Sequence, residues 1–160
     1  MTLRFERQFV VSAPLAQVAA FHSSAESLKA ITPPLAPMHL EEVPDPLVPG
    51  CEMSFRTWVG PFPMYWRAKL EELPGLVSGP GIAGFVDRQL EGPFELWVHQ
   101  HRFEAQGPES TLVHDRIEAR LPSFWSRPRG FLTALSMWLG LAPLFLYRRW
   151  QTRRRLRGRG

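Results

Sequence analysis

Two histidines, His99 and His101, lie two residues apart in a segment whose inward and outward residues alternate. Alternate residues of a β-strand point to the same side of the sheet, so the two imidazoles share a face. A chain reversal at Gly92 would place Asp87 opposite His99, and a second reversal near residue 108 would place Asp115 opposite His101. The sequence therefore predicts a cluster of two imidazoles and two carboxylates on one face of a sheet.

Three interpretations of this cluster stay open from the sequence. In the first, the histidines and carboxylates pair with one another and fix the register of the sheet. In the second, they orient a ligand or act as acid and base, because an imidazole beside a carboxylate exchanges protons near neutral pH. In the third, they bind zinc or iron. Because a His-x-His spacing alone is a weak metal signal, we expect no metal and no cofactor.

Aromatic residues share the phase of the cluster. Trp97 and Phe103 flank the two histidines on the same face of their strand, and Trp66 lies on the inward phase of an earlier strand. The candidate catalytic residues are His99, His101, Asp115 and Asp87. The residues expected to contact a ligand are Trp66, Phe85, Asp87, Gln89, Trp97, His99, His101, Phe103 and Asp115. Two further histidines, His22 and His39, are expected to be exposed.

The elements that position these residues follow from composition and pattern. The chain has 160 residues, 44% of them hydrophobic and 12% aromatic, which is enough for one domain with a sizeable core. Its 16 prolines favour short elements joined by stiff turns, and its single cysteine, Cys51, excludes an internal disulfide and a cysteine-based zinc site. The pattern predicts strands at residues 3–11, 38–43, 52–59, 64–73, 84–90, 94–105 and 110–121, a turn at 60–63 and a loop at 74–82. Two short helices are expected after the first strand, and a long helix after Pro128.

The segment at residues 85–103, FVDRQLEGPFELWVHQHRF, resembles the signature stretch of an uncharacterised bacterial subfamily of the START-like superfamily. These are the SRPBCC or Bet v 1-like proteins, which include polyketide cyclases and lipid-transfer domains. Residues 32–34, Gly50, Trp66 and the strand from Thr111 are similar to that subfamily too. The resemblance implies an α+β helix-grip fold, in which a curved antiparallel sheet of about seven strands wraps a long C-terminal helix around a deep cavity. It implies no reaction, because the superfamily hosts many functions.

The excess of positive charge lies entirely at the C-terminal end of the chain. Residues 148–160 contain seven arginines and no acidic residue, whereas residues 1–147 contain 12 basic and 15 acidic side chains. We therefore expect a ligand-binding domain at residues 1–151 and a disordered Arg-rich tail at 152–160 that contacts anionic membrane surfaces weakly. A nucleic-acid partner is not expected, because the body is acidic and the tail lacks interleaved aromatic residues. No secretory signal opens the chain, which favours a cytoplasmic protein.

The C-terminal helix raises a second question. Residues 130–147 carry no charge, and helical spacing predicts an apolar face formed by Phe131, Leu135, Trp138, Leu139, Ala142, Phe145 and Leu146. The opposite face has small residues with a Ser136-x-x-x-Gly140 spacing, which suits close approach by a second copy in a homodimer or cover by a membrane surface. Pro143 is expected to kink the helix.

The sequence as a whole favours binding of a hydrophobic small molecule, such as a lipid, a polyketide-like compound or an aromatic compound, in a deep cavity. The alternative is a cyclase or dehydratase that uses a His and Asp pair in the same cavity. A second alternative is a peripheral membrane protein that acts through its apolar C-terminal helix and Arg-rich tail.

Overall fold

The structure, a computed structural model, describes residues 2–59, 62–74 and 81–157. Its elements are β1 (Leu3–Val11), α1 (Leu15–His22), α2 (Ala25–Ala30), β2 (Met38–Glu42), β3 (Glu52–Val59), β4 (Phe62–Glu71), β5 (Ile82–Glu91), β6 (Leu96–Gly107), β7 (Ser110–Arg120), α3 (Pro128–Leu139) and α4 (Leu141–Arg155). They confirm the α+β class and the two short helices after the first strand. The first two residues of the expected turn at 60–63 and most of the expected loop at 74–82 lie outside the described residues, and residues 62 and 63 already belong to β4.

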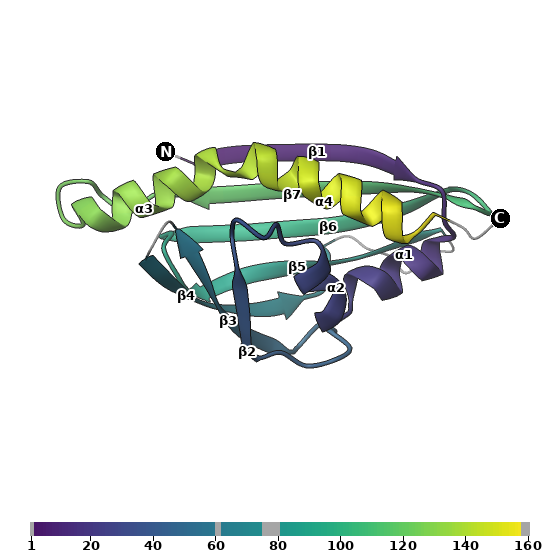
Figure 1. Ribbon diagram of the computed structural model, residues 1–160, viewed down its shortest axis with the longest axis horizontal. Helices are drawn as coiled ribbons and strands as arrows, with labels where there is room; N and C mark the ends of the chain where they lie inside the picture. The colour runs from purple at the N-terminus through teal and green to yellow at the C-terminus, as the bar shows by residue number, and fades with distance from the viewer. Residues whose placement is uncertain (1, 60–61, 75–80, 158–160) are drawn as a thin grey trace.

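The strands form one antiparallel sheet in the order β1-β7-β6-β5-β4-β3-β2. Figure 1 shows the helix pair α3 and α4 running along the sheet beside β1 and β7, with α1 and α2 near the C-terminal end of α4. A curved antiparallel sheet that holds a C-terminal helical segment is the helix-grip fold. The fold predicted from the sequence is therefore confirmed.

The registers predicted for the two hairpins around β6 are also confirmed. Asp87 on β5 lies opposite His99, and Asp115 on β7 lies opposite His101. Buried and more accessible residues alternate along nearly all of β6 and β7, as a sheet with one packed face requires. The packed face of β5, β6 and β7 together carries both histidines and both carboxylates.

Strand β5 approaches β6 very closely at Gly84. A Cβ atom at this position would lie only 2.2 Å from the backbone carbonyl oxygen of His101. Glycine is therefore required here by the close approach of two backbones. The contact holds β5 tightly against the part of β6 that carries the histidines.

The C-terminal helical segment differs from the single long helix expected. α3 ends at Leu139 and α4 begins at Leu141, with a bend of 41° between them. The break comes before Pro143 because the proline ring would clash with the carbonyl of Leu139, four residues earlier, in a continuous helix. In the first turn of α4 proline has no intrahelical hydrogen bond to lose. Among the described residues no single helix is long and apolar enough to cross a membrane, although the bent pair passes that test by length and composition only.

The start of the expected disordered tail is helical. α4 continues to Arg155, and Thr152 and Leu156 are buried. The guanidinium Nε of Arg153 donates a hydrogen bond to the carbonyl oxygen of Val10 on β1, at 2.9 Å. The boundary expected after residue 151 therefore falls inside a helix, because Thr152 and Leu156 extend its packed face by one turn.

Candidate functional site

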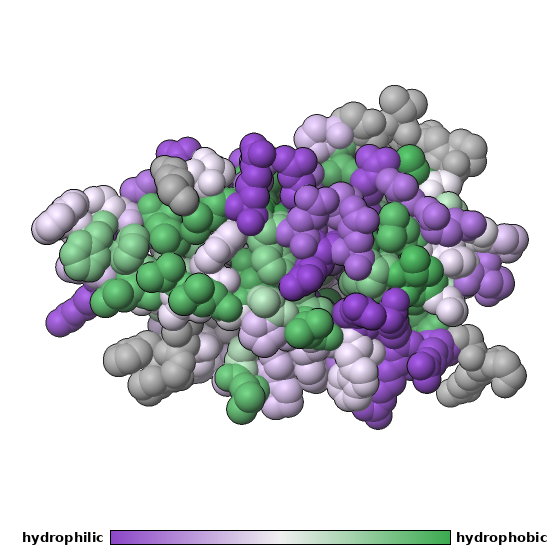
Figure 2. Space-filling model, turned by 90° about the horizontal axis from the view of Figure 1, so that it is seen from above, coloured by the Kyte–Doolittle hydropathy of each residue, from purple (hydrophilic) through white to green (hydrophobic). Residues whose placement is uncertain are grey.

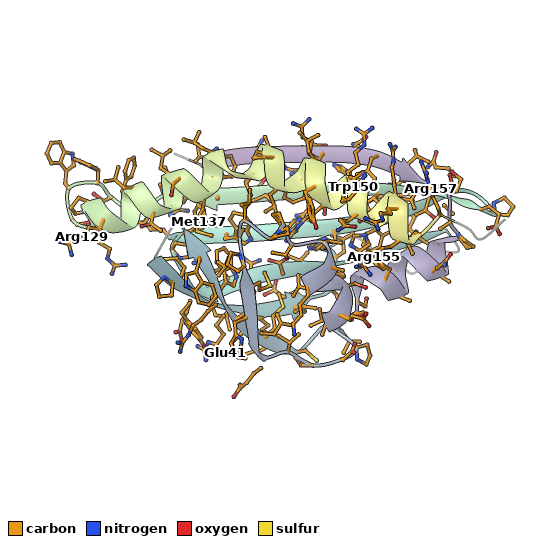
Figure 3. All side chains as sticks on the ribbon, in the orientation of Figure 1. Glu41, Arg129, Met137, Trp150, Arg155 and Arg157 are labelled. Carbon is orange, nitrogen blue, oxygen red and sulfur yellow. The ribbon has the colours of Figure 1, made fainter. Side chains whose placement is uncertain are left out.

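A cavity of about 590 Å³ lies between the sheet and the helix pair. Most of its wall is apolar and includes Ile31, Met53, Phe55, Trp66, Leu70, Trp97, Met137 and Leu141. Figure 3 shows side chains from the sheet and the helices filling the space between them, with Met137 on the helix side. The ionisable side chains on the wall are His22, Asp87, His99, His101, Tyr147 and Arg148. A mostly apolar cavity with a few polar groups is the usual form of a small-molecule site.

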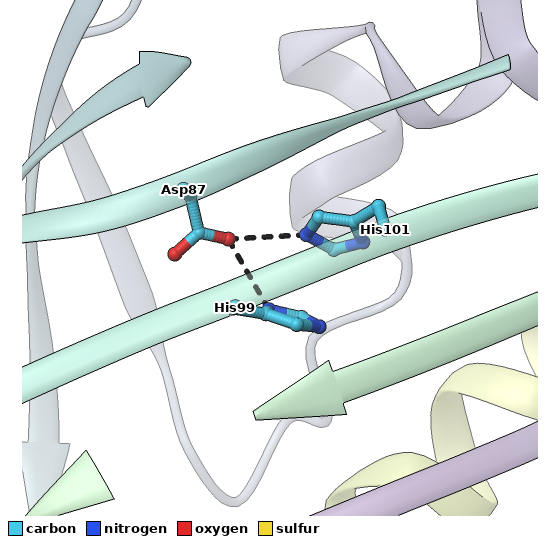
Figure 4. Close-up of side chains that lie close together, drawn as sticks. All are labelled: Asp87, His99 and His101. Carbon is cyan, nitrogen blue, oxygen red and sulfur yellow. Dashed lines mark hydrogen bonds and ion pairs between the residues drawn. The ribbon is translucent and has the colours of Figure 1, made fainter. Parts of the chain in front are cut away.

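Four side chains from β5, β6 and β7 form a closed ring of contacts, which we call the His–Asp ring. Its members are Asp87, His99, His101 and Asp115. Oδ2 of Asp87 lies 3.2 Å from Nδ1 of His99 and 3.0 Å from Nε2 of His101 (Figure 4). Oδ1 of Asp115 lies 3.1 Å from Nε2 of His99 and 3.0 Å from Nδ1 of His101. In the two contacts with hydrogen-bond geometry the Nε2–H groups donate, because an ionised carboxylate can only accept.

Strand geometry and packing fix the ring in place. The two registers bring each carboxylate opposite one histidine, and the diagonal reach of the side chains supplies the other two contacts. The imidazole centroids of His99 and His101 are 3.8 Å apart, the ring of Phe85 is 4.5 Å from His101, and the ring of Phe145 on α4 stands edge-on 5.6 Å from His99. All four side chains of the His–Asp ring are buried, so packing determines their orientations as well as charge does.

In the His–Asp ring, each charged side chain stabilises the charged form of the side chains it contacts. Burial alone would raise the pKa of both carboxyls, but the contacting imidazoles hold the pKa of Asp87 and of Asp115 well below the usual range. Burial alone would lower the pKa of His101, but hydrogen bonds and charge from Asp115 and Asp87 raise it to about 9. His101 is therefore an imidazolium at neutral pH, with a carboxylate on either side. Because its ring also lines the cavity, its positive charge acts on a bound molecule while both ring nitrogens contact carboxylates.

His22, which was expected to be exposed, is half-buried and lines the cavity. Its ring lies 4.8 Å from the ring of Phe103 and 6.4 Å from that of His101. Nε2 of His22 is shielded and has no hydrogen-bond partner among the described residues, and burial lowers the pKa of the side chain to about 3. The available signal was its position four residues after the buried Val18 on the same helix face. His39 is exposed, as predicted.

Arg148 is a second cavity residue that was not among the expected ligand contacts, because it was counted only in the basic C-terminal segment at residues 148–160. It lies on α4, lines the cavity, and places its guanidinium carbon 5.1 Å from the ring centroid of Phe145. The available signal was helical spacing, since Arg148 follows Leu141 and Phe145 by seven and three residues and both of these are buried.

The structure places most of the expected ligand-contacting residues on the cavity wall. Those that line it are Trp66, Phe85, Asp87, Trp97, His99 and His101. Three do not reach it. Asp115 lies behind the histidines that it contacts, and Phe103 is fully packed beside His22. Gln89 instead binds the backbone of Phe94, donating to its carbonyl at 2.7 Å, and so holds the hairpin together.

The faces of the C-terminal helices differ in part from those expected. Phe145 is buried and Trp138 packs against Phe5, as predicted, but other positions differ. Ser136, Gly140 and Pro143 line the cavity, whereas Leu139 and Leu146 are 69% and 58% exposed. The prediction assumed one straight helix, and the break before α4 changes which residues face the sheet. The small residues therefore leave room for the cavity.

Three members of the His–Asp ring are close enough together to hold a metal ion. Each of Asp87, His99 and His101 offers one ligand atom, and these atoms all lie within 4.8 Å of one another. Two imidazoles and a carboxylate are a ligand set for zinc or iron. A metal would have to displace the proton of His101, whose pKa is raised to about 9, and compete with the carboxylates that already contact both imidazoles. The absence of a metal stays a prediction.

No family model matches the sequence, and no curated protein matches it. Solved structures with the same architecture are more informative. Ginseng major latex-like protein 151 from Panax ginseng is similar with a TM-score of 0.64 at 13% identity, covering 98% of this chain and 99% of that chain. The Zhui aromatase/cyclase from Streptomyces sp. R1128 is similar with a TM-score of 0.63 at 17% identity, covering 100% of this chain and 99% of that chain.

Norcoclaurine synthase from Thalictrum flavum, solved with dopamine and hydroxybenzaldehyde, is similar with a TM-score of 0.54 at 12% identity, covering 87% of both chains. At these identities the likeness shows a shared fold. The chain therefore has the helix-grip fold of the Bet v 1-like, or SRPBCC, proteins, as the resemblance in the sequence implied.

Proposed function

We propose that this protein binds a hydrophobic small molecule, such as a lipid, a polyketide-like compound or an aromatic compound, in the cavity between its sheet and its C-terminal helices. The observation that carries the proposal is the cavity itself. Its volume of about 590 Å³ falls within the usual range for ligand pockets, and apolar side chains form most of its wall. The similar solved structures include an aromatase/cyclase and a synthase, and the synthase was solved with two aromatic compounds. Both support this class of ligand.

Aromatic side chains on the sheet side of the cavity favour flat or ring-containing ligands. The ring of Trp66 lies 5.3 Å from that of Trp97 in an edge-on arrangement and 6.0 Å from that of Phe55 in a stacked one. Such rigid aromatic surfaces bury large apolar area and adapt little. A ligand would therefore be recognised by the shape of this surface together with the polar groups near His101.

The test is mass spectrometry of small molecules extracted from the purified protein, together with titration of a fluorescent apolar probe. Ser136→Trp places a bulky ring on α3 at the cavity wall, and Leu139→Trp places the same ring on an exposed part of α3 away from it. We expect bound ligand or probe with the unmodified protein and with Leu139→Trp, and at least tenfold weaker binding with Ser136→Trp. Absence of any retained compound together with no probe binding would contradict the proposal.

A second candidate function, cyclisation or dehydration of the bound molecule, is favoured by one observation. Asp87, His99 and His101 line the cavity that would hold the ligand, and His101 is charged at neutral pH. Incubation of the protein with the extracted ligand should then yield a product that has lost water or closed a ring. The product should be absent with His101→Gln, whereas binding of the ligand should remain.

A further inference from the structure

We propose that Arg148 binds an acidic group of the ligand, so that the molecule taken by the cavity is an amphipathic organic anion with an apolar body and a carboxylate. This inference rests on the proposed binding function and adds the chemical class of the ligand. Arg148 lies on the wall of the cavity, which is mostly apolar.

Arg148 projects from the packed face of α4. The buried residues Leu141, Phe145 and Thr152 follow one another at spacings of four and seven residues, and Arg148 lies between the last two on the same face. The other arginines at this end of the chain behave differently. Arg149 is exposed, and Arg153 is tied to the backbone of Val10.

The guanidinium of Arg148 has no ionic partner within the described part of the chain. Its Nε is shielded from solvent and donates no hydrogen bond there, and none of the ion pairs between described residues includes this side chain. The two nearby carboxylates, Asp87 and Asp115, each contact two imidazole nitrogens instead. Arg148 is half-buried, and its shielded Nε has no close partner among the described residues, so a ligand that supplied an acidic partner would gain free energy from it.

The chemistry of the guanidinium narrows the choice of ligand. Its planar set of N–H donors matches the two oxygens of a carboxylate, and charge-assisted hydrogen bonds of this kind are stronger than neutral ones. The cavity wall also includes Leu144, Phe145 and Met137, which offer apolar contacts for a chain or ring. An apolar carboxylic acid satisfies both parts of the site, whereas a neutral molecule would fill the cavity and leave Arg148 unpaired.

The test compares each acid with the alcohol of the same skeleton. Dodecanoate and dodecanol serve as the chain pair, 2-naphthoate and 2-naphthalenemethanol as the ring pair, and binding is followed by calorimetry and by the fluorescence of the cavity tryptophans. For at least one pair we expect the unmodified protein to bind the acid at least tenfold more tightly than the alcohol. Arg148→Gln should remove that preference and leave alcohol binding unchanged. Arg149→Gln, which removes an exposed charge one residue away, should behave like the unmodified protein.

The outcomes separate the two proposals. Equal binding of acid and alcohol by the unmodified protein would overturn the role of Arg148 and leave the binding function standing. An acid preference that survives in Arg148→Gln would overturn it as well. If none of the four probes binds, this inference is overturned for chain and ring acids, and the proposed function is decided separately by the extraction and fluorescent-probe test. If Arg148→Gln does not fold, equal binding of acid and alcohol by the unmodified protein still overturns the proposal.

Discussion

The acid side of the pH dependence should depend on His22. Burial lowers the pKa of His22 from 6.5 to about 3, so the folded protein holds this imidazole neutral while the unfolded chain protonates it. The stabilisation from the neutral form is complete above pH 6.5 and is lost as the pH falls toward 3. Above pH 3.8, the ordinary pKa of an aspartate, the carboxylates of the His–Asp ring are ionised in both the folded and the unfolded chain. They therefore add little to the change of the free energy of unfolding with pH.

We therefore expect the free energy of unfolding, measured by urea titration, to decrease as the pH is lowered from 6.5 to 3.8. His22→Phe should flatten the curve over that interval, because phenylalanine can pack against Phe103 without a titrating group. A slope that is the same in both proteins would show that His22 is not responsible. His39→Phe is the matched control, since His39 is exposed.

The alkaline side should depend on His101, with the opposite sign. Its pKa is raised from 6.5 to about 9, so its stabilisation is complete below pH 6.5 and is lost as the pH rises through about 9. We expect the free energy of unfolding to fall over this interval. In His101→Gln that fall should be absent, and stability at neutral pH should be lower by about 3 to 5 kcal/mol, because two buried carboxylates lose a charged partner. Unchanged alkaline behaviour in the variant would contradict this assignment.

At the scale of single residues, the sequence was sufficient to predict the positions of the His–Asp ring residues. It was not sufficient to predict that His22 and Arg148 line the same cavity. Strand periodicity and two tight reversals determine which residues face each other, so Asp87 and His101 could be placed from the pattern alone. His22 and Arg148 could not, because each looks like the polar end of a helix or tail. Their burial depends on how α1 and α4 dock on the sheet, and that docking is a long-range property of the fold.

Among the elements, the pairing of β5 with β6 has the clearest consequence for mutation. Gly84→Ala would place a Cβ atom 2.2 Å from the carbonyl oxygen of His101, so the strands must separate. We expect a loss of about 1 to 3 kcal/mol in the free energy of unfolding, typical of overpacking, together with weaker ligand binding. Gly107→Ala is the control, since a Cβ there meets nothing within 4 Å. Equal stability of the two variants would show that the close approach is not needed.

The helices show where element-level prediction stops. A run of uncharged residues predicts a helix of the right length, and Pro143 correctly indicates an irregularity, but not on which side of the proline the chain bends. The bend at Gly140 turns Ser136 toward the cavity and leaves Leu139 exposed. A helical wheel drawn for a straight helix cannot show this, because the two halves have different axes.

At the scale of the whole molecule, the exposed apolar side chains lie close to the positive charge. Leu132, Leu139, Leu146 and Trp150 are each more than half exposed along α3 and α4, and Figure 2 shows apolar side chains gathered toward the end where α3 lies. Arginines lie at both ends of the helix pair, among them Arg129, Arg155 and Arg157, which are labelled in Figure 3. The membrane contact, the homodimer and the cytoplasmic location expected from the sequence all stay predictions.

Contact with an anionic membrane can be tested directly. Each arginine close to a negative surface contributes on the order of 1 kcal/mol, and salt screens this attraction. The full chain should therefore sediment with phosphatidylserine vesicles at low salt and be released at high salt, and it should not sediment with phosphatidylcholine vesicles. Trp150→Glu should weaken sedimentation without changing ligand binding, because Trp150 is exposed and is not part of the cavity wall. Sedimentation that ignores both lipid charge and salt would show that the basic end of α4 has no such role, which would leave Arg148 at the cavity and Arg153 on the backbone of β1 as its structurally placed arginines.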